Sequence, residues 1–254
     1  MMEKVNKKFD EQGFLIIKNF YNYNDEILPI KRGIFEIANL VLKNHNYDTL
    51  GNEKELFCGD ILVEIAKVKR SLVAEIYDKI KQLPEFNALI SSNKNLELFK
   101  NFRVNSMPGV ITRGSGIRID LPQEAEYRAH WHQEYPTQLS SIDGLVFWSP
   151  LIEITKDIGP VEVCVGSHKN GIYDVYHENN SSQSGAYSQR IKDIESIIKK
   201  HKIISPLLNP GDLLVMDFLT LHQSGVNIAS QPRWSMQFRW FNFLGAQPKV
   251  ESGL

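Results

Sequence analysis

The chain changes character near residue 101, and this change limits the folds that are open to it. Before that point apolar residues recur every three or four positions, as in DEILPIKRGIFEIANLVLKNH (25–45), which is typical of an amphipathic helix. After it, short β-rich runs such as GLVFWSPLIEI (144–154) and GDLLVMDFL (211–219) are separated by Pro and Gly. Helices and strands are segregated rather than alternating, which argues against a doubly wound α/β fold.

The periodic segments predict where the helices and strands lie. FDEQGFLIIKNF (9–20) predicts a short helix, a turn at Gly13 and a strand. We expect a helix after Asn24, capped by that residue or by Asp25, a second over about 61–83 and a third over about 86–100.

The fold that follows is an α+β fold with a mainly β core. We expect a double-stranded β-helix, that is a jelly-roll or cupin-like barrel, buttressed by the N-terminal helices. One domain is expected to span 1–254, with a helical buttress over 1–100 and the barrel over 101–254. The polar stretch 170–200 interrupts the strands and is a candidate lid over the barrel.

Charge, hydropathy and cysteine usage exclude several classes of function. The 254 residues carry a formal net charge of -1, which gives no general attraction to nucleic acid or to anionic membranes. The first residues lack the apolar core of a signal peptide, and no apolar run approaches a membrane span. The two cysteines, Cys58 and Cys164, are far apart, which argues against a disulfide framework or a thiolate zinc site. We expect a cytoplasmic monomer or homodimer that binds a small molecule, with His and carboxylate ligands for any metal.

The stretch HWHQEYP (130–136) concentrates three potential metal ligands. His130, His132 and Glu134 would all point to one face if this segment is extended, because residues two apart on a strand share a face. The spacing alone leaves open which two of the three bind a metal. Among the other histidines the strongest candidate for a further ligand is His222, which ends the strand-like GDLLVMDFLTLH.

Two histidines and one carboxylate leave three positions of an octahedral metal open. Non-haem Fe(II) oxygenases need these positions for a bidentate co-substrate, typically 2-oxoglutarate, and for O2. The far carboxylate of 2-oxoglutarate needs a cation, and Arg233 lies eleven residues after His222, beyond a turn at NIASQP. Arg118, in the strand-like GIRID, is a candidate contact for an anionic substrate.

Taken together, these stretches resemble the phytanoyl-CoA dioxygenase family of Fe(II)- and 2-oxoglutarate-dependent oxygenases. FDEQGFLIIKNF is similar to the N-terminal segment of that family, WHQE to its metal motif, TKDIGPVEVCVGSHK to its Gly-Ser-His segment, and GDLLVMDFLTLHQSGVN followed by PR to its distal histidine and arginine. The resemblance runs nearly end to end. Two positions depart from it: Glu134 stands where aspartate is usual, and Val165 stands where proline is usual.

The resemblance implies a role for each matching residue. His132, Glu134 and His222 would bind iron, and Arg233 would pair with the C5 carboxylate of 2-oxoglutarate, helped by Ser224. Three further residues would line the pocket: Gln133 and Trp148 beside the co-substrate, and His130 on the substrate side.

The implied activity is hydroxylation of an unactivated C–H bond with release of succinate and CO2. The polar stretch 170–200 carries three tyrosines, Tyr173, Tyr176 and Tyr187, which favours a small polar metabolite: a carbohydrate, an amino-acid derivative or a natural-product intermediate. Two alternatives stay open: a cupin-type metal enzyme that does not use 2-oxoglutarate, and a non-catalytic small-molecule-binding module on the same fold.

Overall fold

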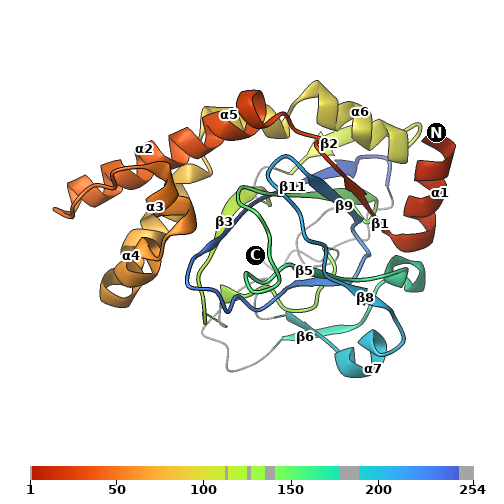
Figure 1. The fold of residues 1–254 in the computed structure, drawn as a ribbon. Coiled ribbons are helices and arrows are strands. Elements are labelled where there is room, and N and C mark those ends of the chain that lie inside the picture. Colours follow the sequence, from red (N-terminus) through yellow and green to blue (C-terminus); the bar gives the residue numbers. More distant parts are fainter. Residues whose placement is uncertain (1, 112–113, 125–126, 135–140, 178–188, 246–254) are drawn as a thin grey trace.

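The helices of the chain lie mostly before residue 103 and cover one side of a β-barrel (Figure 1). The computed structural model describes residues 2–111, 114–124, 127–134, 141–177 and 189–245. Its helices are α1 (Met2–Gln12), the π-helix η1 (Tyr23–Ile27), α2 (Leu28–Asn44), α3 (Glu53–Cys58), α4 (Ile61–Ile80), α5 (Pro84–Ile90), α6 (Asn93–Phe102), the 3-10 helix η3 (Ser167–Asn170) and α7 (Ile194–Ile198). Among the described residues, no helix combines the length and the apolar character needed to cross a bilayer.

The strands form antiparallel sheets. They are β1 (Phe14–Ile17), β2 (Pro108–Val110), β3 (Gly116–Asp120), β4 (Gly144–Pro150), β5 (Val161–Cys164), β6 (Val175–His177), β7 (Gln189–Ile191), β8 (Ile203–Ile204), β9 (Leu213–Asp217), β10 (His222–Ser224) and β11 (Arg233–Asn242). The larger sheet has the order β1-β9-β4-β11-β2, and β3 also pairs with β11. A smaller sheet has the order β10-β5-β8, and β6 pairs with β7 as a separate hairpin.

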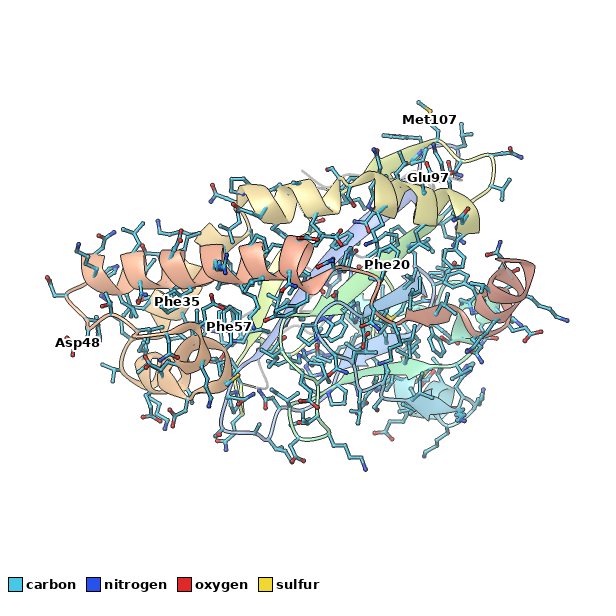
Figure 2. All side chains as sticks on the ribbon, turned by 45° about the horizontal axis from the view of Figure 1, so that its top comes forward. Phe20, Phe35, Asp48, Phe57, Glu97 and Met107 are labelled. Atoms are coloured by element: carbon cyan, nitrogen blue, oxygen red, sulfur yellow. The ribbon has the colours of Figure 1, made fainter. Side chains whose placement is uncertain are left out.

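The long strand β11 separates the helices from the barrel interior. Successive side chains of a strand point to opposite faces. On the outer face Trp234 packs against Phe57 of α3 with ring centroids 5.0 Å apart, and Trp240 Nε1 donates a hydrogen bond to the carbonyl of Ile90. Figure 2 shows side chains filling the space between helices and sheet, with Phe57 labelled there. The inner face carries polar residues of β11: Arg233, Ser235, Gln237 and Arg239.

The fold class expected from the sequence is confirmed: helices buttress an antiparallel β core of jelly-roll type. The turn at Gly13, with φ 79°, and the strand after it are also as expected. Two local expectations are wrong. The segment 86–100 forms two helices, because α5 ends at Ile90 with Ser91 as its C-cap, and Ser92 then caps α6 by accepting a hydrogen bond from the backbone N–H of Asn95. Helix η1 is capped by Asn22, whose side chain accepts from the two residues that follow Tyr23.

The candidate lid is only partly described. Its described parts are η3, the hairpin strands β6 and β7, and helix α7. Residues 178–188, which join the two hairpin strands, lie outside the described residues. The lid and the single-domain organisation therefore stay predictions.

Candidate metal centre

A single β-bridge brings the two halves of the metal motif together. The segment around His132 does not form the strand that would carry three ligands on one face; instead, His132 pairs with His222 of β10 as an isolated antiparallel bridge. The backbone N–H of each histidine donates to the carbonyl of the other, at 3.0 and 3.1 Å. The N–H of Glu134 donates to the carbonyl of Phe218 at 3.0 Å. These backbone contacts fix the ends of both segments side by side at the barrel mouth.

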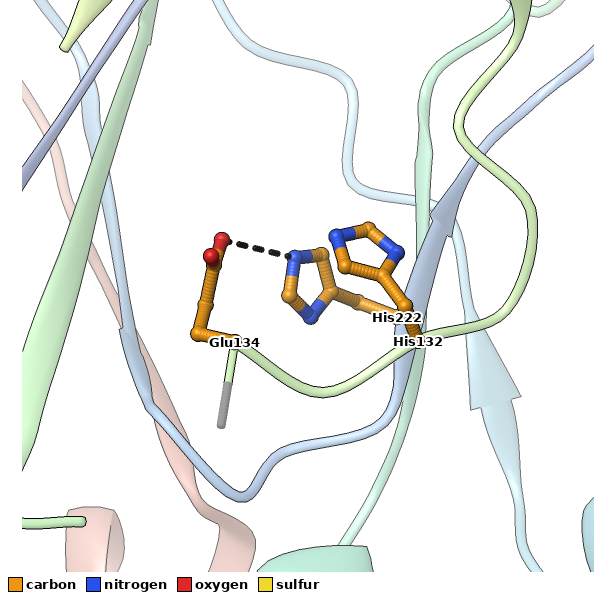
Figure 3. Close-up of side chains that lie close together, drawn as sticks. All are labelled: His132, Glu134 and His222. Carbon is orange, nitrogen blue, oxygen red and sulfur yellow. Dashed lines mark ion pairs between the residues drawn. The ribbon is translucent and has the colours of Figure 1, made fainter. Parts of the chain in front are cut away.

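The side chains of His132, Glu134 and His222 converge on one point (Figure 3). One ligand atom from each lies within 4.8 Å of the others. His222 Nε2 is 3.7 Å from Glu134 Oε1, which is too long for a hydrogen bond and leaves room for an ion between the atoms. The sequence left open which histidine of HWH joins Glu134, and the geometry selects His132.

Both imidazoles are held in the form that a metal requires. His132 Nδ1 lies 2.6 Å from the carbonyl oxygen of His130, and His222 Nδ1 lies 2.8 Å from that of Thr220. Because a carbonyl oxygen can only accept, each Nδ1 carries a proton, so the neutral form of each ring has its lone pair on Nε2. A hydrogen bond from the second ring nitrogen is the usual way of orienting a metal-binding histidine.

Electrostatics also favours a neutral imidazole at His132. Burial and the neighbouring ring of His222, with centroids 4.3 Å apart, lower the pKa of His132 to about 3. At neutral pH the imidazole is therefore unprotonated at Nε2, and no proton has to leave before a metal binds.

Glu134 is fully buried and forms a two-pronged ion pair with Arg239. Arg239 Nε lies 2.7 Å from Oε2 and Nη2 lies 2.6 Å from Oε1, and Arg239 Nη1 also donates to the carbonyl of Gly114. Burial alone would raise the pKa of Glu134, but the Arg239 guanidinium and the His222 ring outweigh it and hold that pKa well below its usual value. The carboxylate is therefore ionised at neutral pH.

A cavity opens beside the triad and contains several residues singled out from the sequence. His132 and His222 line it, together with His130, Trp148, Ser224 and Arg118. The remaining described lining residues are Ala129, Val146, Val161, Gln189, Arg190, Met216, Gln223, Gln237 and Arg239. None of these described lining residues is acidic and three are arginines, of which Arg239 and Arg118 are paired with the carboxylates of Glu134 and Asp120.

Arg233 lies next to this cavity and lines an adjoining one. Its Nη2 is 2.9 Å from Ser224 Oγ, so the arginine and the serine paired from the sequence do meet. The guanidinium also binds Asp120, with Nη2 2.7 Å from Oδ2, and donates to the carbonyl of Gly159. Asp120 is shared with Arg118, and although burial would raise the pKa of Asp120, the two guanidinium groups hold it well below its usual value. The co-substrate role of Arg233 and Ser224 stays a prediction.

Gln133 has a different orientation from the other predicted pocket residues. Its Nε2 donates to the carbonyls of Gly171 and Leu219, at 2.8 Å each, and its Oε1 accepts from the backbone N–H of Tyr173. The amide thus links the metal motif to the segment before the β6–β7 hairpin. Its role beside the co-substrate stays a prediction.

The site contains residues that the sequence interpretation missed, chiefly Arg239 and Asp120. Arg239 lies six residues after Arg233, and an even spacing on a strand puts both on one face. This even spacing is visible in the stretch RWSMQFRW (233–240). Its partner could not be read from the sequence, since it depends on how the HWHQE segment docks across the barrel.

An antiparallel jelly-roll barrel with two histidines and one carboxylate at its mouth defines a class of proteins with a facial-triad metal centre. Within that class the family follows from a direct match. The model of the phytanoyl-CoA dioxygenase (PhyH) family matches residues 9–235, which is most of the chain. The chain belongs to this family, which confirms the resemblance found in the sequence.

Solved structures with a similar fold cover almost the whole chain. The epimerase SnoN, in complex with Fe3+, alpha ketoglutarate and nogalamycin RO, has a TM-score of 0.64 at 11% identity, covering 97% of this chain and 85% of that chain. EvdO2 from Micromonospora carbonacea var. aurantiaca, complexed with 2-oxoglutarate, has a TM-score of 0.63 at 16% identity, covering 97% and 92%. The alpha ketoglutarate dependent carbocyclase SnoK from nogalamycin biosynthesis has a TM-score of 0.61 at 13% identity, covering 99% and 88%. At these identities the likeness concerns the fold.

Proposed function

We propose that the protein is an Fe(II)- and 2-oxoglutarate-dependent oxygenase that hydroxylates an unactivated C–H bond of a small polar metabolite, releasing succinate and CO2. The observation that carries this proposal is the triad: the side chains of His132, Glu134 and His222 each bring one ligand atom to a common point, and both histidines are oriented through Nδ1. Family membership over residues 9–235 supports the choice of metal and co-substrate, as do the Fe3+ and alpha ketoglutarate in the SnoN complex and the 2-oxoglutarate in the EvdO2 complex.

The donor set fits ferrous iron. It consists of two imidazole nitrogens and one carboxylate oxygen with no thiolate, which is the facial set of non-haem Fe(II) oxygenases. Bound iron would supply the oxidising power of the reaction, using O2 and the decarboxylation of 2-oxoglutarate. The protein's part is to hold the three ligands, to orient the co-substrate and to limit access of water.

Arg233 and Ser224 are the proposed anchor for the far carboxylate of 2-oxoglutarate. Ser224 lines the metal cavity and accepts a hydrogen bond from Arg233, so it joins the cavity to the buried guanidinium behind it. Arg233 is only 1% exposed, and a buried guanidinium binds a carboxylate more strongly than an exposed one. Trp148 forms part of the apolar wall beside them, with Val146, Val161 and Met216.

The rest of the cavity is polar, which supports a polar substrate rather than an acyl chain. His130, Gln189, Gln223 and Gln237 line it together with Arg190 of the β6–β7 hairpin. Arg118 also lines this cavity.

A second outcome of the same chemistry is a rearrangement without hydroxylation. The neighbours SnoN and SnoK are an epimerase and a carbocyclase, and both depend on alpha ketoglutarate. Mass analysis of the product separates these outcomes, because hydroxylation adds one oxygen, whereas epimerisation adds none.

The proposal is tested by measuring binding and turnover in one series. The purified protein should bind one Fe(II) and, without O2, develop the weak visible band of an iron–2-oxoglutarate chelate, and His132→Ala should lose both. Substrates are then screened by succinate release. Iron binding without any response to 2-oxoglutarate would favour a cupin-type metal enzyme, and a chain that binds no iron would favour a binding module.

A further inference from the structure

The ion pair between Glu134 and Arg239 has a role that the triad alone does not explain. Glutamate is longer than aspartate by one methylene, so its carboxylate reaches farther and has more rotational freedom. In this chain the reach ends on a guanidinium that is 3% exposed, and both carboxylate oxygens accept from it. The carboxylate of Glu134 is therefore held in one position by Arg239, despite the longer side chain.

The geometry turns one oxygen of Glu134 toward the metal site. The guanidinium fork takes one lone pair on each carboxylate oxygen, at 2.6 Å on Oε1 and 2.7 Å on Oε2. Of the two oxygens it is Oε1 that faces His222 Nε2, at 3.7 Å. Rotation of the carboxylate to offer both oxygens to one ion would break the fork.

Arg239 is itself held in place. Its Nη1 donates to the carbonyl of Gly114, and its backbone belongs to β11, where Arg239 is paired with Val146 of β4. The guanidinium is thus anchored on the side away from Glu134 and cannot easily follow the carboxylate toward an ion.

We propose that Arg239 is a positioning residue that keeps Glu134 bound to the metal through a single oxygen. This inference rests on the proposed function, since the reaction needs three open positions on the metal for 2-oxoglutarate and O2. A glutamate that bound through both oxygens would fill one of them. Glu134 and Arg239 act as a matched unit, in which the longer acid is tolerated because the fork restrains it.

The inference is tested on the metal-loaded protein with Mn(II), whose bound water is counted by proton relaxation. In Arg239→Met we expect Mn(II) affinity to fall roughly 10- to 100-fold, as for other partners of metal ligands. We also expect water relaxation per bound Mn(II) to fall by about one third, because one of three open positions is filled. Arg239→Lys keeps the charge without the fork and should behave like Arg239→Met.

Arg70→Met is the matched control. Arg70 and Glu124 form a pair with the same two-pronged geometry, at 2.6 and 2.9 Å, but partly exposed, between α4 and the loop after β3; among the described contacts none joins it to the triad. Its loss should leave Mn(II) affinity and relaxation unchanged. If the role of Arg239 is purely structural, Arg239→Met should resemble Arg70→Met: its thermal stability should fall, while its Mn(II) affinity and water relaxation should stay unchanged.

A shorter acid provides a second, independent test that does not remove the arginine. Glu134→Asp restores the residue usual in the family but withdraws the carboxylate from Arg239, so we expect weaker Mn(II) binding than in the unaltered protein. The effects of Glu134→Asp and Arg239→Met should not add in the double variant, because both break the same pair. Unchanged Mn(II) affinity and relaxation in Arg239→Met, or additive effects, would overturn the inference. An unaltered protein that binds neither Mn(II) nor Fe(II) would instead overturn the proposed function.

Discussion

The inner face of β11 carries a buried arginine near each end, and the two have different surroundings. Arg239 is paired with Glu134, one arginine to one carboxylate, and that carboxylate belongs to the metal triad. Arg233 is paired with Asp120, which also accepts from Arg118, so two guanidinium groups share one carboxylate. Arg233 also donates to Ser224, on the wall of the metal cavity.

We propose that this difference separates two tasks of one strand. At the Arg239 end the guanidinium holds the carboxylate of Glu134, so this end would serve the metal. At the Arg233 end the guanidinium reaches Ser224 on the wall of the metal cavity, so this end would bind a carboxylate of a ligand. The period-two alternation of β11 places Arg233 and Arg239 on one face, while the other face packs on the helices.

The largest effect is expected from removing a metal ligand. In His222→Ala the imidazole that faces Glu134 is lost, and we expect stoichiometric iron and all succinate formation to disappear. Iron content and succinate assays measure this. Retention of 2-oxoglutarate binding by this variant would show that the Arg233 end works alone and would sharpen the division of tasks, whereas retention of stoichiometric iron would contradict the assignment of His222 to the metal.

Truncating Arg233 should affect the co-substrate and spare the metal. Losing a buried partner of a charge-assisted pair costs about 2–5 kcal/mol, so the KM for 2-oxoglutarate in Arg233→Ala should rise roughly 30-fold or more. Metal affinity measured without 2-oxoglutarate should stay within about twofold, because no atom of Arg233 contacts the triad among the contacts described. An unchanged KM in this variant would contradict the co-substrate assignment.

Asp120 gives the Arg233 end a dependence on pH. Its pKa is lowered in the folded protein, so its ion pairs contribute stability above the unfolded pKa of about 3.9 and lose it as pH falls through the lower folded value. In Asp120→Asn we expect a loss of about 3–5 kcal/mol at neutral pH, as for a broken buried pair. The difference from the unaltered protein should shrink as pH falls below about 4, which urea unfolding at several pH values measures. A difference that stays constant with pH would mean that Asp120 does not carry this charge in the folded state.

The smallest effect is expected at Ser224. Its hydroxyl accepts from Arg233 at 2.9 Å, and removal of one such hydrogen bond costs about 0.5–1.5 kcal/mol. In Ser224→Ala the KM for 2-oxoglutarate should rise roughly 2- to 10-fold, with kcat and metal affinity unchanged. Steady-state assays of succinate formation check this, and a changed metal affinity would contradict the assignment of Ser224 to the Arg233 end.

Much of the fold could be predicted because it depends on local patterns. The helix periodicity before residue 101 and the alternation in RWSMQFRWFNFL both follow from which faces are buried, and Trp234 and Trp240 do pack against the helices. The pairing of Arg233 with Ser224 was also within reach, because both lie on strands that follow one another in the chain.

What could not be predicted depends on contacts between distant segments. The pairing of Glu134 with Arg239 joins residues 105 apart, and that of Asp120 with Arg233 joins residues 113 apart. The metal motif lies on an isolated bridge rather than a strand, because its hydrogen bonds go to the turn and strand at Phe218 and His222. No local pattern encodes that docking.

The central claim is that the two ends of β11 serve different ligands, and one measurement tests it directly. In Arg233→Met and Arg239→Met, calorimetry should record Fe(II) binding without 2-oxoglutarate, and then 2-oxoglutarate binding at saturating Fe(II), both without O2. We expect Arg239→Met to lose metal affinity and Arg233→Met to lose only 2-oxoglutarate affinity. Equal losses of metal affinity in both variants, or normal 2-oxoglutarate affinity in Arg233→Met, would contradict the claim.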